Sequence, residues 1–284
     1  MASSASSRPS RVEKEQDVAD ELSIAVFGIT GRMGKALIAA IDEAAGARLS
    51  GACASQKSAW IGREVRTLGA SSDAIVAADA KGALEGADVA IDFSLPEATE
   101  ANVAACVSMQ RPLVIGTTGH SSRVRDAIEA AARDIPIVIA PNMSLGVNLL
   151  LRLVELTAQK LDDSYDIEVF EAHHRNKKDA PSGTALALGN AAARGRGVAL
   201  QDASEHDRHG ANVPRRKGAI GFSVFRGGDV VGDHTVTFAG LGERIELTHR
   251  ASDRLAFARG AVQAARWLVG KAPGRYSMQD VLGI

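Results

Sequence analysis

The first half of the chain alternates between short apolar runs and segments whose apolar side chains recur at helical spacing. This pattern predicts strands at 22–27, 47–54, 87–93, 112–115 and 136–140, and helices at 35–44, 96–109 and 122–133. Five strands that each feed a helix or a loop favour a parallel, doubly wound sheet of the Rossmann-like α/β class.

The pattern changes after residue 142. A helix is predicted at 147–161, and strands at 165–172, 234–238 and 244–248, whose alternating character indicates an antiparallel sheet. A helix at 252–269, capped by Ser252, and a short tail at 277–282 are expected to return to the first sheet. The segment 192–217, rich in Arg, Gly and Asp, is expected to be a flexible loop.

Two domains follow from this organisation, and a length of 284 residues is consistent with two. We predict a disordered extension at 1–21 and a dinucleotide-binding domain formed by 22–144 together with 252–284. An α+β domain with a mostly antiparallel sheet, which would bind the substrate, is predicted at 145–251.

Composition narrows the class of protein. The formal net charge is −1, so no global field attracts nucleic acid or an anionic membrane. No apolar run reaches the roughly 20 residues that span a bilayer, and the Ser-rich start lacks the apolar core of a secretory signal. Two cysteines without metal-binding spacing argue against disulfides and structural zinc. A soluble, cytoplasmic protein is expected.

The segment between the first strand and the first helix has the spacing of a dinucleotide-binding turn. Its glycines let a strand turn tightly into a helix whose N-terminal amides face a pyrophosphate, and Arg32 adds a positive charge. The residues expected to contact the cofactor there are Gly28, Ile29, Thr30, Gly31, Arg32 and Met33.

The end of the second strand bears on the choice of cofactor. An acidic residue usually stands there to bind the ribose 2′-hydroxyl of NAD, but here Ala54 and Ser55 are followed by Gln56 and Lys57. A hydroxyl and an ammonium group favour the 2′-phosphate of NADPH, so NADPH, or use of both NADPH and NADH, is expected.

Loops after later strands should line the same crevice, because the carboxyl ends of parallel strands share one edge of the sheet. The residues expected there, besides the loop at 92–94, are Gly116, Thr117, Thr118, Ala140, Pro141, Asn142 and Met143.

The densest reactive segment is 171–185, Glu-Ala-His-His-Arg-Asn-Lys-Lys-Asp-Ala-Pro-Ser-Gly-Thr-Ala. Cationic side chains leave a strand here, and a helix predicted at 185–193 begins just after Ser-Gly-Thr, so the segment suits a carboxylate-bearing substrate. His173 and His174 point to opposite sides of an extended chain and have different roles. A histidine can donate the proton that reduction of a C=C–C=N system requires, and Lys177 can supply or steer a proton or neutralise a carboxylate. His206, His209, His234 and His249 are scattered and interpreted as structural or surface residues.

With these motifs in place, the chain from residue 22 to 284 resembles the dihydrodipicolinate reductase family, now called 4-hydroxy-tetrahydrodipicolinate reductase, of diaminopimelate and lysine biosynthesis. The resemblance implies NAD(P)H-dependent reduction, with His173 as proton donor and acceptor, Lys177 as proton donor, and His174, Gly183 and Thr184 as substrate-binding residues. It also implies a homotetramer assembled through the second domain. Members often carry an acidic residue and an arginine where Ala54 and Ser55 stand, so cofactor preference does not transfer.

Three other interpretations predict different features. Another two-domain oxidoreductase, acting on aspartate or a sugar, would keep the glycine turn but not the cluster at 173–184. A dinucleotide-sensing binding protein would lack convergent acid and carboxylate-binding groups. A metal hydrolase would need a third ligand at suitable spacing beside the paired histidines, so no metal is expected.

Overall fold

The computed structural model describes residues 21–284. The extension predicted at 1–21 lies outside the described residues except for Glu21. Within 21–284, no helix is long and apolar enough to cross a membrane.

The first half of the chain and one strand from its C-terminal end build a parallel sheet of seven strands in the order β12-β6-β5-β4-β1-β2-β3. The strand order reverses at β1, so that β1 and β4 flank the switch point where open α/β sheets bind ligands. The strands are β1 (Leu22–Phe27), β2 (Ala47–Cys53), β3 (Val76–Ala77), β4 (Val89–Asp92), β5 (Leu113–Ile115), β6 (Pro136–Ile139) and β12 (Gly274–Tyr276).

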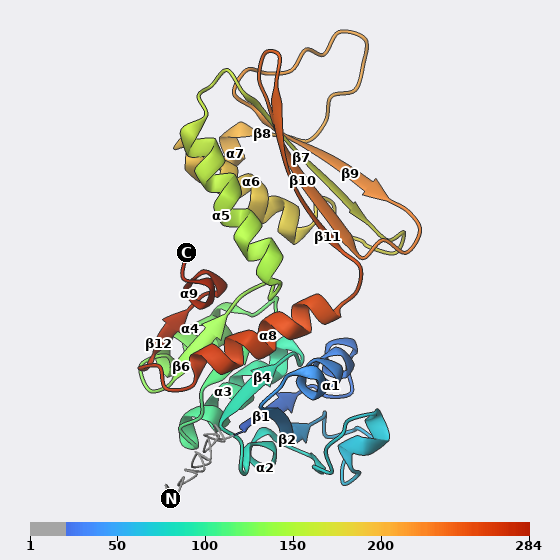
Figure 1. Ribbon diagram of the computed structural model, residues 1–284, viewed down its shortest axis with the longest axis vertical. Coiled ribbons are helices and arrows are strands. Elements are labelled where there is room, and N and C mark those ends of the chain that lie inside the picture. Colours follow the sequence, from blue (N-terminus) through green and yellow to red (C-terminus); the bar gives the residue numbers. More distant parts are fainter. Residues whose placement is uncertain (1–20) are drawn as a thin grey trace, which may run out of the picture.

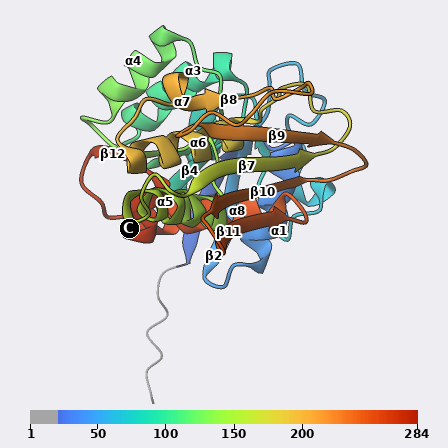
Figure 2. The ribbon, with the colours of Figure 1, turned by 90° about the horizontal axis from the view of Figure 1, so that it is seen from above.

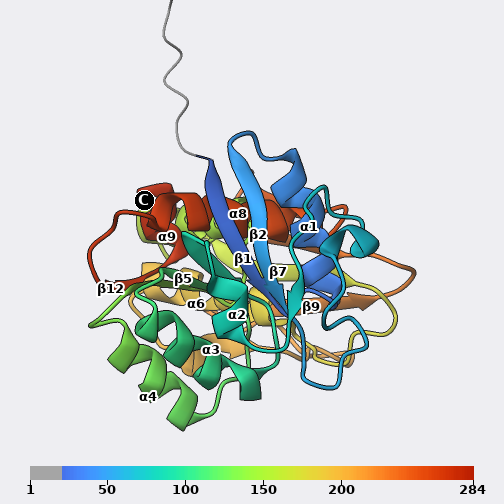
Figure 3. The ribbon, with the colours of Figure 1, turned by 90° about the horizontal axis from the view of Figure 1, so that it is seen from below.

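Helices cover both faces of this sheet because successive strand residues point to opposite sides. Ile24 and Val26 of β1 pack with α1 and α8, whereas Ala25 and Phe27 pack with α2, α3 and α4. Figure 3 shows the sheet between these two layers. The helices are α1 (Arg32–Glu43), α2 (Ala80–Leu84), α3 (Pro96–Ser108), α4 (Ser122–Ala131), α8 (Leu255–Leu268) and α9 (Met278–Leu282), with a 3-10 turn at Val65–Leu68.

The second sheet has five strands in the order β11-β10-β7-β9-β8. β10 pairs antiparallel with both β7 and β11, whereas β9 runs parallel to β7 and to β8. Figure 2 shows β9, β7, β10 and β11 side by side. These strands are β7 (Asp166–His173), β8 (Ser204–Glu205), β9 (Ile220–Arg226), β10 (Gly232–Ala239) and β11 (Arg244–Ala251).

One face of the second sheet is covered by α5 (Leu145–Lys160) and α6 (Gly183–Arg196), with α7 (Leu200–Ala203) beside them. Val154 and Leu188 from the helices meet Val169 and Val236 from the strands in a buried core. Figure 1 shows the two sheets towards opposite ends of the molecule, connected by α5 and by the passage from β11 into α8.

The predicted fold class is confirmed, a parallel Rossmann-like sheet with a second, mostly antiparallel sheet. Several details differ. Strands β3, β8, β9 and β12 and helices α2 and α7 were not predicted, so the first sheet has seven strands and not five. The parallel pairing of β9 with β7 makes the second sheet mixed. The helix at the C-terminal end starts at Leu255 after Arg254, and the amide of Leu255 donates to Asp253 (2.7 Å), so Ser252 does not cap it. The segment 192–217 contains the end of α6, all of α7 and β8, so part of it is ordered.

Candidate active site

The glycine-rich turn joins β1 to α1 with little room for side chains. Gly28 has a φ of +82°, and the amides of Gly28 and Ile29 donate to the carbonyl of Cys53 (3.0 and 3.2 Å). A Cβ on Gly28 would lie 2.6 Å from the Phe93 carbonyl oxygen, and one on Gly34 would lie 2.2 Å from that of Ile29. Only glycine fits at these two positions.

The start of α1 fits a pyrophosphate. Its N-cap is Gly31, which offers no side chain to the first amides of the helix, whereas serines cap α4, α5 and α6. Uncapped amides at the positive end of a helix dipole suit an anion. Arg32 is exposed beside this end, and Thr30 and Met33 are half-buried. Ile29 is fully buried, so only its backbone can face a cofactor.

The ends of β4 and β5 are tied together by Asp92, which is fully buried. Its carboxylate accepts hydrogen bonds from the Ser94 amide (2.8 Å) and the Thr117 hydroxyl (3.2 Å). The hydroxyl of Thr117 is therefore turned into the protein, and Thr118 is the exposed hydroxyl of this loop. A Cβ on Gly116 would lie 2.2 Å from the Phe93 ring, so the loop packs closely over that ring.

The end of β2 presents polar side chains without a carboxylate. Ala54 is buried, whereas Ser55, Gln56 and Lys57 are exposed. This loop follows β2 on the same edge of the sheet as the glycine turn, because the parallel pairing of β1 and β2 aligns Phe27 with Cys53.

The loop after β6 reaches the second half of the chain through Asn142. Its side-chain oxygen accepts from the Ser144 amide (2.9 Å), and its side-chain nitrogen donates to the Thr184 hydroxyl (3.2 Å). Its carbonyl accepts from the Asn148 side chain (2.9 Å). Of its neighbours, Ala140 and Met143 are buried and Pro141 is exposed. A predicted cofactor residue thus contacts a predicted substrate residue directly.

His173, the last residue of β7, lies at the centre of the second group of residues. Its side chain is almost buried, with 8% exposed, and its Nδ1 lies 2.5 Å from the Glu171 carboxylate. Glu171 is two residues earlier on the same strand, which places both side chains on the same face. The other oxygen of Glu171 accepts from the Ser182 amide (2.9 Å) at the start of α6.

Arg226, at the end of β9, completes this arrangement. Its two terminal nitrogens donate to the two oxygens of Glu171 (2.7 and 2.8 Å), and one also donates to the Asp179 carbonyl (2.6 Å). Burial by itself would raise the pKa of Glu171, but hydrogen bonds from Arg226, His173 and the Ser182 amide outweigh it and hold that pKa below its ordinary value. Glu171 is therefore ionised at neutral pH.

The imidazole of His173 is held in its neutral form. Burial lowers the pKa of His173, and the contact with Glu171 offsets only part of that effect, because the charges of Lys177 and Arg226 act in the same direction as burial. An ionised carboxylate can only accept a hydrogen bond, so Nδ1 of His173 carries the proton and Nε2 has the free lone pair.

His234, on β10, packs edge-on against His173 with ring centroids 5.1 Å apart. Its Nε2 lies 3.2 Å from the Ser182 hydroxyl, and burial lowers the pKa of His234 to about 4. The sequence predicts a structural or surface residue at this position. The structure buries His234 and places it against the predicted proton donor.

The remaining predicted substrate residues surround the start of α6. Gly183 is exposed as the first residue of the helix, Thr184 is half-buried, and Ser182 caps the helix by accepting from the Ala185 amide (3.1 Å). Lys177 forms an ion pair with Asp179 (2.9 Å) and keeps about a fifth of its side chain exposed, and His174 is partly exposed.

Sequence reasoning identified His173 but missed the side chains that hold it. Glu171 could have been found from the two-residue period of the strand. Arg226 and His234 could not, because their strands are paired with β7 only in the folded sheet. Among residues 21–284, no hydrogen bond or ion pair joins the glycine turn or Ser55 to this group, and Asn142 provides the link.

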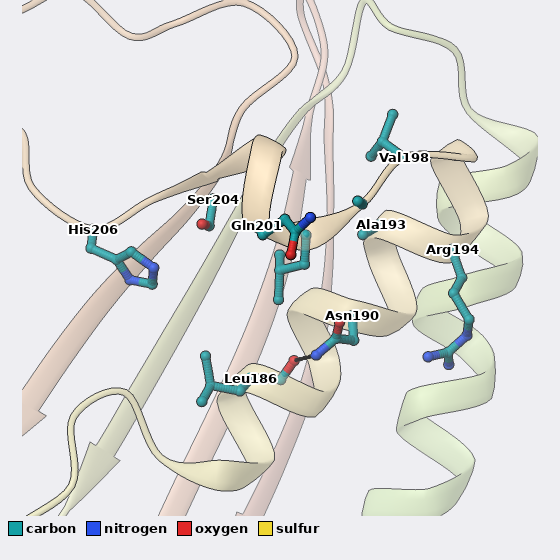
Figure 4. Close-up of a pocket in the computed structure, with 10 residues that line it drawn as sticks. Leu186, Asn190, Ala193, Arg194, Val198, Gln201, Ser204 and His206 are labelled. Atoms are coloured by element: carbon teal, nitrogen blue, oxygen red, sulfur yellow. Dashed lines mark hydrogen bonds between the residues drawn. The ribbon is translucent and has the colours of Figure 1, made fainter.

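A separate hollow of about 490 Å³ lies between α6, α7 and β8 (Figure 4). Leu186, Asn190 and Gln201 line it, and none of its lining residues belongs to the predicted site. In the part of the chain that the structure describes, no three His, Cys, Asp or Glu side chains are grouped to hold a metal ion.

The fold and these groups define the class of protein. A parallel sheet has an uncapped glycine turn at the start of α1. A second sheet holds a buried histidine bonded to a carboxylate, close to the start of α6. This is the arrangement of a nicotinamide-dependent oxidoreductase.

Comparison with known proteins narrows the class. Family models match at residues 22–143 (dihydrodipicolinate reductase, N-terminus) and 146–282 (dihydrodipicolinate reductase, C-terminus). The chain is 50% identical over 262 residues to 4-hydroxy-tetrahydrodipicolinate reductase of Thiobacillus denitrificans. The aligned region covers 92% of this chain and 98% of that relative. The corresponding protein of Alkalilimnicola ehrlichii is 51% identical over 263 residues, with coverage of 92% and 98%. The chain belongs to the dihydrodipicolinate reductase family.

Solved structures share the fold. A dipicolinate-bound dihydrodipicolinate reductase from Paenisporosarcina sp. TG-14 has a TM-score of 0.72 at 22% identity, covering 91% of this chain and 98% of that one. A probable dehydrogenase from Thermotoga maritima has a TM-score of 0.59 at 11% identity, covering 92% of both chains.

Proposed function

We propose that this protein reduces 4-hydroxy-tetrahydrodipicolinate, by way of dihydrodipicolinate, to tetrahydrodipicolinate in diaminopimelate and lysine biosynthesis. The observation that carries the proposal is about 50% identity, over 92% of the chain, to relatives named for this reaction. The chemistry of the site agrees with it, because His173 and the start of α6 combine a proton-transfer group with an anion-binding helix end.

The cofactor would be held by the glycine turn and the neighbouring loops. The uncapped amides of α1 and Arg32 suit the pyrophosphate, and the loops at 116–118 and 140–143 suit the nicotinamide half. When bound, the dinucleotide supplies a hydride. Gly28 and Gly34 keep the turn from β1 into α1 tight, since a larger residue at either position would collide with the Phe93 or Ile29 backbone.

The substrate carboxylates would be bound at the start of α6. The exposed amide of Gly183 and the hydroxyl of Thr184 are hydrogen-bond donors at the positive end of the helix dipole. Because the nitrogen of Asn142 donates to the Thr184 oxygen, the hydroxyl proton of Thr184 remains available to a carboxylate. Lys177 would add positive charge at the same place, and His174 would add a hydrogen-bonding side chain.

The proton would come from His173 or Lys177. Hydride addition to a conjugated C=C–C=N system must be followed by a proton at the neighbouring atom, and Nε2 of His173 is the nitrogen that faces away from Glu171. A bound dicarboxylate favours the protonated imidazole, which opposes the effect of burial on the His173 pKa. Lys177 is partly exposed at the same loop and can deliver or relay a proton.

We propose that NADPH, or both NADPH and NADH, serve as the reductant. Support comes from the end of β2, where Ser55 and Lys57 are exposed and residues 54–58 include no carboxylate. Parallel kinetics with the two cofactors tests this, because a specificity of kcat/KM for NADH would contradict it.

We further propose a dinucleotide-binding domain of 22–144 and 252–284 and a substrate domain of 145–251, with four copies assembled through the second domain. The outer face of the second sheet supports the assembly. It carries partly exposed Phe170 and Phe225, and none of the described helices packs on it. A cytoplasmic location agrees with two buried, unpaired cysteines, and cell fractionation tests it.

The deciding experiment follows absorbance at 340 nm with the freshly made condensation product of pyruvate and aspartate-semialdehyde, with NADH and NADPH in parallel. Rapid oxidation of either is expected. No oxidation with either cofactor would reject the activity and return attention to another two-domain oxidoreductase or to a dinucleotide-sensing protein.

A further inference from the structure

The Glu171 carboxylate joins three elements of the second half of the chain. It is fully buried, and both of its oxygens accept two hydrogen bonds. Donors to it come from β7, from the start of α6 and from β9. Glu171 therefore holds both His173 and the start of α6 in position. It does not need to react itself to do so.

We propose that Glu171 and Arg226 form a positioning pair that fixes the proton of His173 on Nδ1, so that Nε2 exchanges protons with the substrate. This inference rests on the proposed function, because the substrate side of His173 has a role only if a proton is transferred there. Glu171 orients the imidazole, and Arg226 keeps Glu171 ionised by a bidentate contact.

Arg226 also limits how strongly Glu171 holds the proton of His173. A buried carboxylate without a counter-charge would stabilise the imidazolium and retain its proton. With Arg226 bound to both oxygens, the charge of Glu171 is balanced within the pair. The imidazolium can then release the proton that it gains, which is what a group that donates a proton in every turnover requires.

The same pair aligns the substrate groups with His173. Glu171 accepts from the Ser182 amide, which begins the helix start at Gly183 and Thr184. Arg226 donates to the carbonyl of Asp179, whose carboxylate binds Lys177. Displacing the pair would move the proton donor, the anion site and Lys177 relative to one another.

Several charged or titratable groups lie around His173, and each of them affects the pKa that a pH titration of His173 measures. They are Glu171 on its own strand, Arg226 from β9, His234 from β10, and Lys177 with Asp179 from the loop after β7. Changes at Glu171 and at Arg226 leave the other groups in place, and the two changes have opposite effects on the charge beside His173. A loss of packing would not produce opposite effects.

Glu171→Gln should invert the tautomer of His173. Arg226 donates to both oxygens of Glu171, so the Ser182 amide, a backbone donor that cannot become an acceptor, keeps the amide oxygen on its own side. The NH2 group then faces Nδ1. Nδ1 must then accept, and the proton moves to Nε2. The pKa of His173 should fall, and kcat should fall by about 10- to 100-fold with a smaller change in KM.

Arg226→Met should act in the opposite direction. Glu171 then lacks its counter-charge, so the pKa of His173 should rise by about one unit or more. Arg226→Lys keeps the charge but loses the bidentate geometry, and its shift should be smaller. Arg226→Lys also provides a test if Arg226→Met does not fold. An unchanged pKa of His173 in Arg226→Lys would contradict the proposal.

The measurement is a pH titration of the protein labelled with ¹⁵N-histidine, followed by NMR, with the His173 signals assigned by their loss in His173→Gln. The control variants are Glu155→Gln and Arg194→Met, which change a Glu–Arg ion pair between α5 and α6. Equal or same-direction shifts in Glu171→Gln and Arg226→Met would overturn the proposal. Failure of the wild type to oxidise NAD(P)H would reject the proposed function without altering the titration.

Discussion

At the scale of single residues, His173 is the side chain that we propose transfers the proton. Replacing it by Gln should lower kcat by roughly 10² to 10⁴ because no general acid remains at that position, while cofactor affinity is kept. Steady-state kinetics and cofactor titration measure both. His209→Gln, at an exposed histidine, is the matched control. An unchanged kcat in His173→Gln would remove this residue from the chemistry.

His234 should make the stability of the fold depend on pH. Burial lowers the pKa of His234 to about 4 in the folded protein, so between its ordinary pKa near 6.5 and that value the unfolded chain binds more protons. Stability is then lost as the pH falls through this window, by about 2 kcal/mol between pH 7 and pH 5.

Urea unfolding of the wild type and of His234→Gln at pH 7 and pH 5 measures this effect. The variant should lose less stability on acidification, because its side chain does not titrate. An equal loss in both proteins would show that other groups, among them His173 and His249, account for it.

At the scale of elements, Asn142 connects the loop after β6 to the start of α6. Asn142→Ala removes the bond to Thr184 and the bond to the Ser144 amide, each worth about 1 kcal/mol. The KM for the acid and the Kd for the cofactor should therefore both rise by about fivefold. Kinetics and calorimetry measure the two constants.

Asn190→Ala is the matched control for that variant, because Asn190 bonds only the Leu186 carbonyl within α6. A rise in KM alone would mean that Asn142 serves the substrate site without contributing to the cofactor loop.

Some strands and helices could be predicted from the periodicity of apolar residues, and others could not. The strands at 22–27 and 136–140 and the helices at 96–109 and 122–133 were predicted to within a few residues, because each depends on neighbours along the chain. Strand β9 was missed, although Ile220, Phe222 and Val224 stand at the two-residue period of a strand. Its parallel pairing with β7 is a property of the folded sheet. The Ser252 cap was wrong because Asp253 binds the first amide of α8 instead.

At the scale of the whole molecule, the uncovered face of the second sheet should be an interface between copies. Phe170 is 43% exposed on that face, and a charge there would be buried on assembly at substantial cost. Phe170→Asp should therefore yield particles smaller than a tetramer, as measured by light scattering after gel filtration.

Leu149→Asp is the control for assembly, because Leu149 is 44% exposed on α5 and lies off the sheet. A wild-type protein that is monomeric at micromolar concentration would contradict the proposed assembly directly.

The sequence by itself determined the parts of this protein that depend on nearby residues. The glycine turn, the five central strands of the first sheet and the segment 171–185 could be identified, because backbone freedom, side-chain periodicity and helix starts are local properties. Ser55 is exposed and Thr184 is half-buried, and their contacts with cofactor and substrate stay predictions.

Only the tertiary structure decided what surrounds His173. Arg226 and His234 stand 53 and 61 residues further along the chain than His173 and meet it through the register of β7 with β9 and β10. The same register buries Glu171 and places it within hydrogen-bond distance of both His173 and Arg226. Pairing between strands far apart in sequence depends on the packing of the whole sheet against α5 and α6, and no local pattern contains that information.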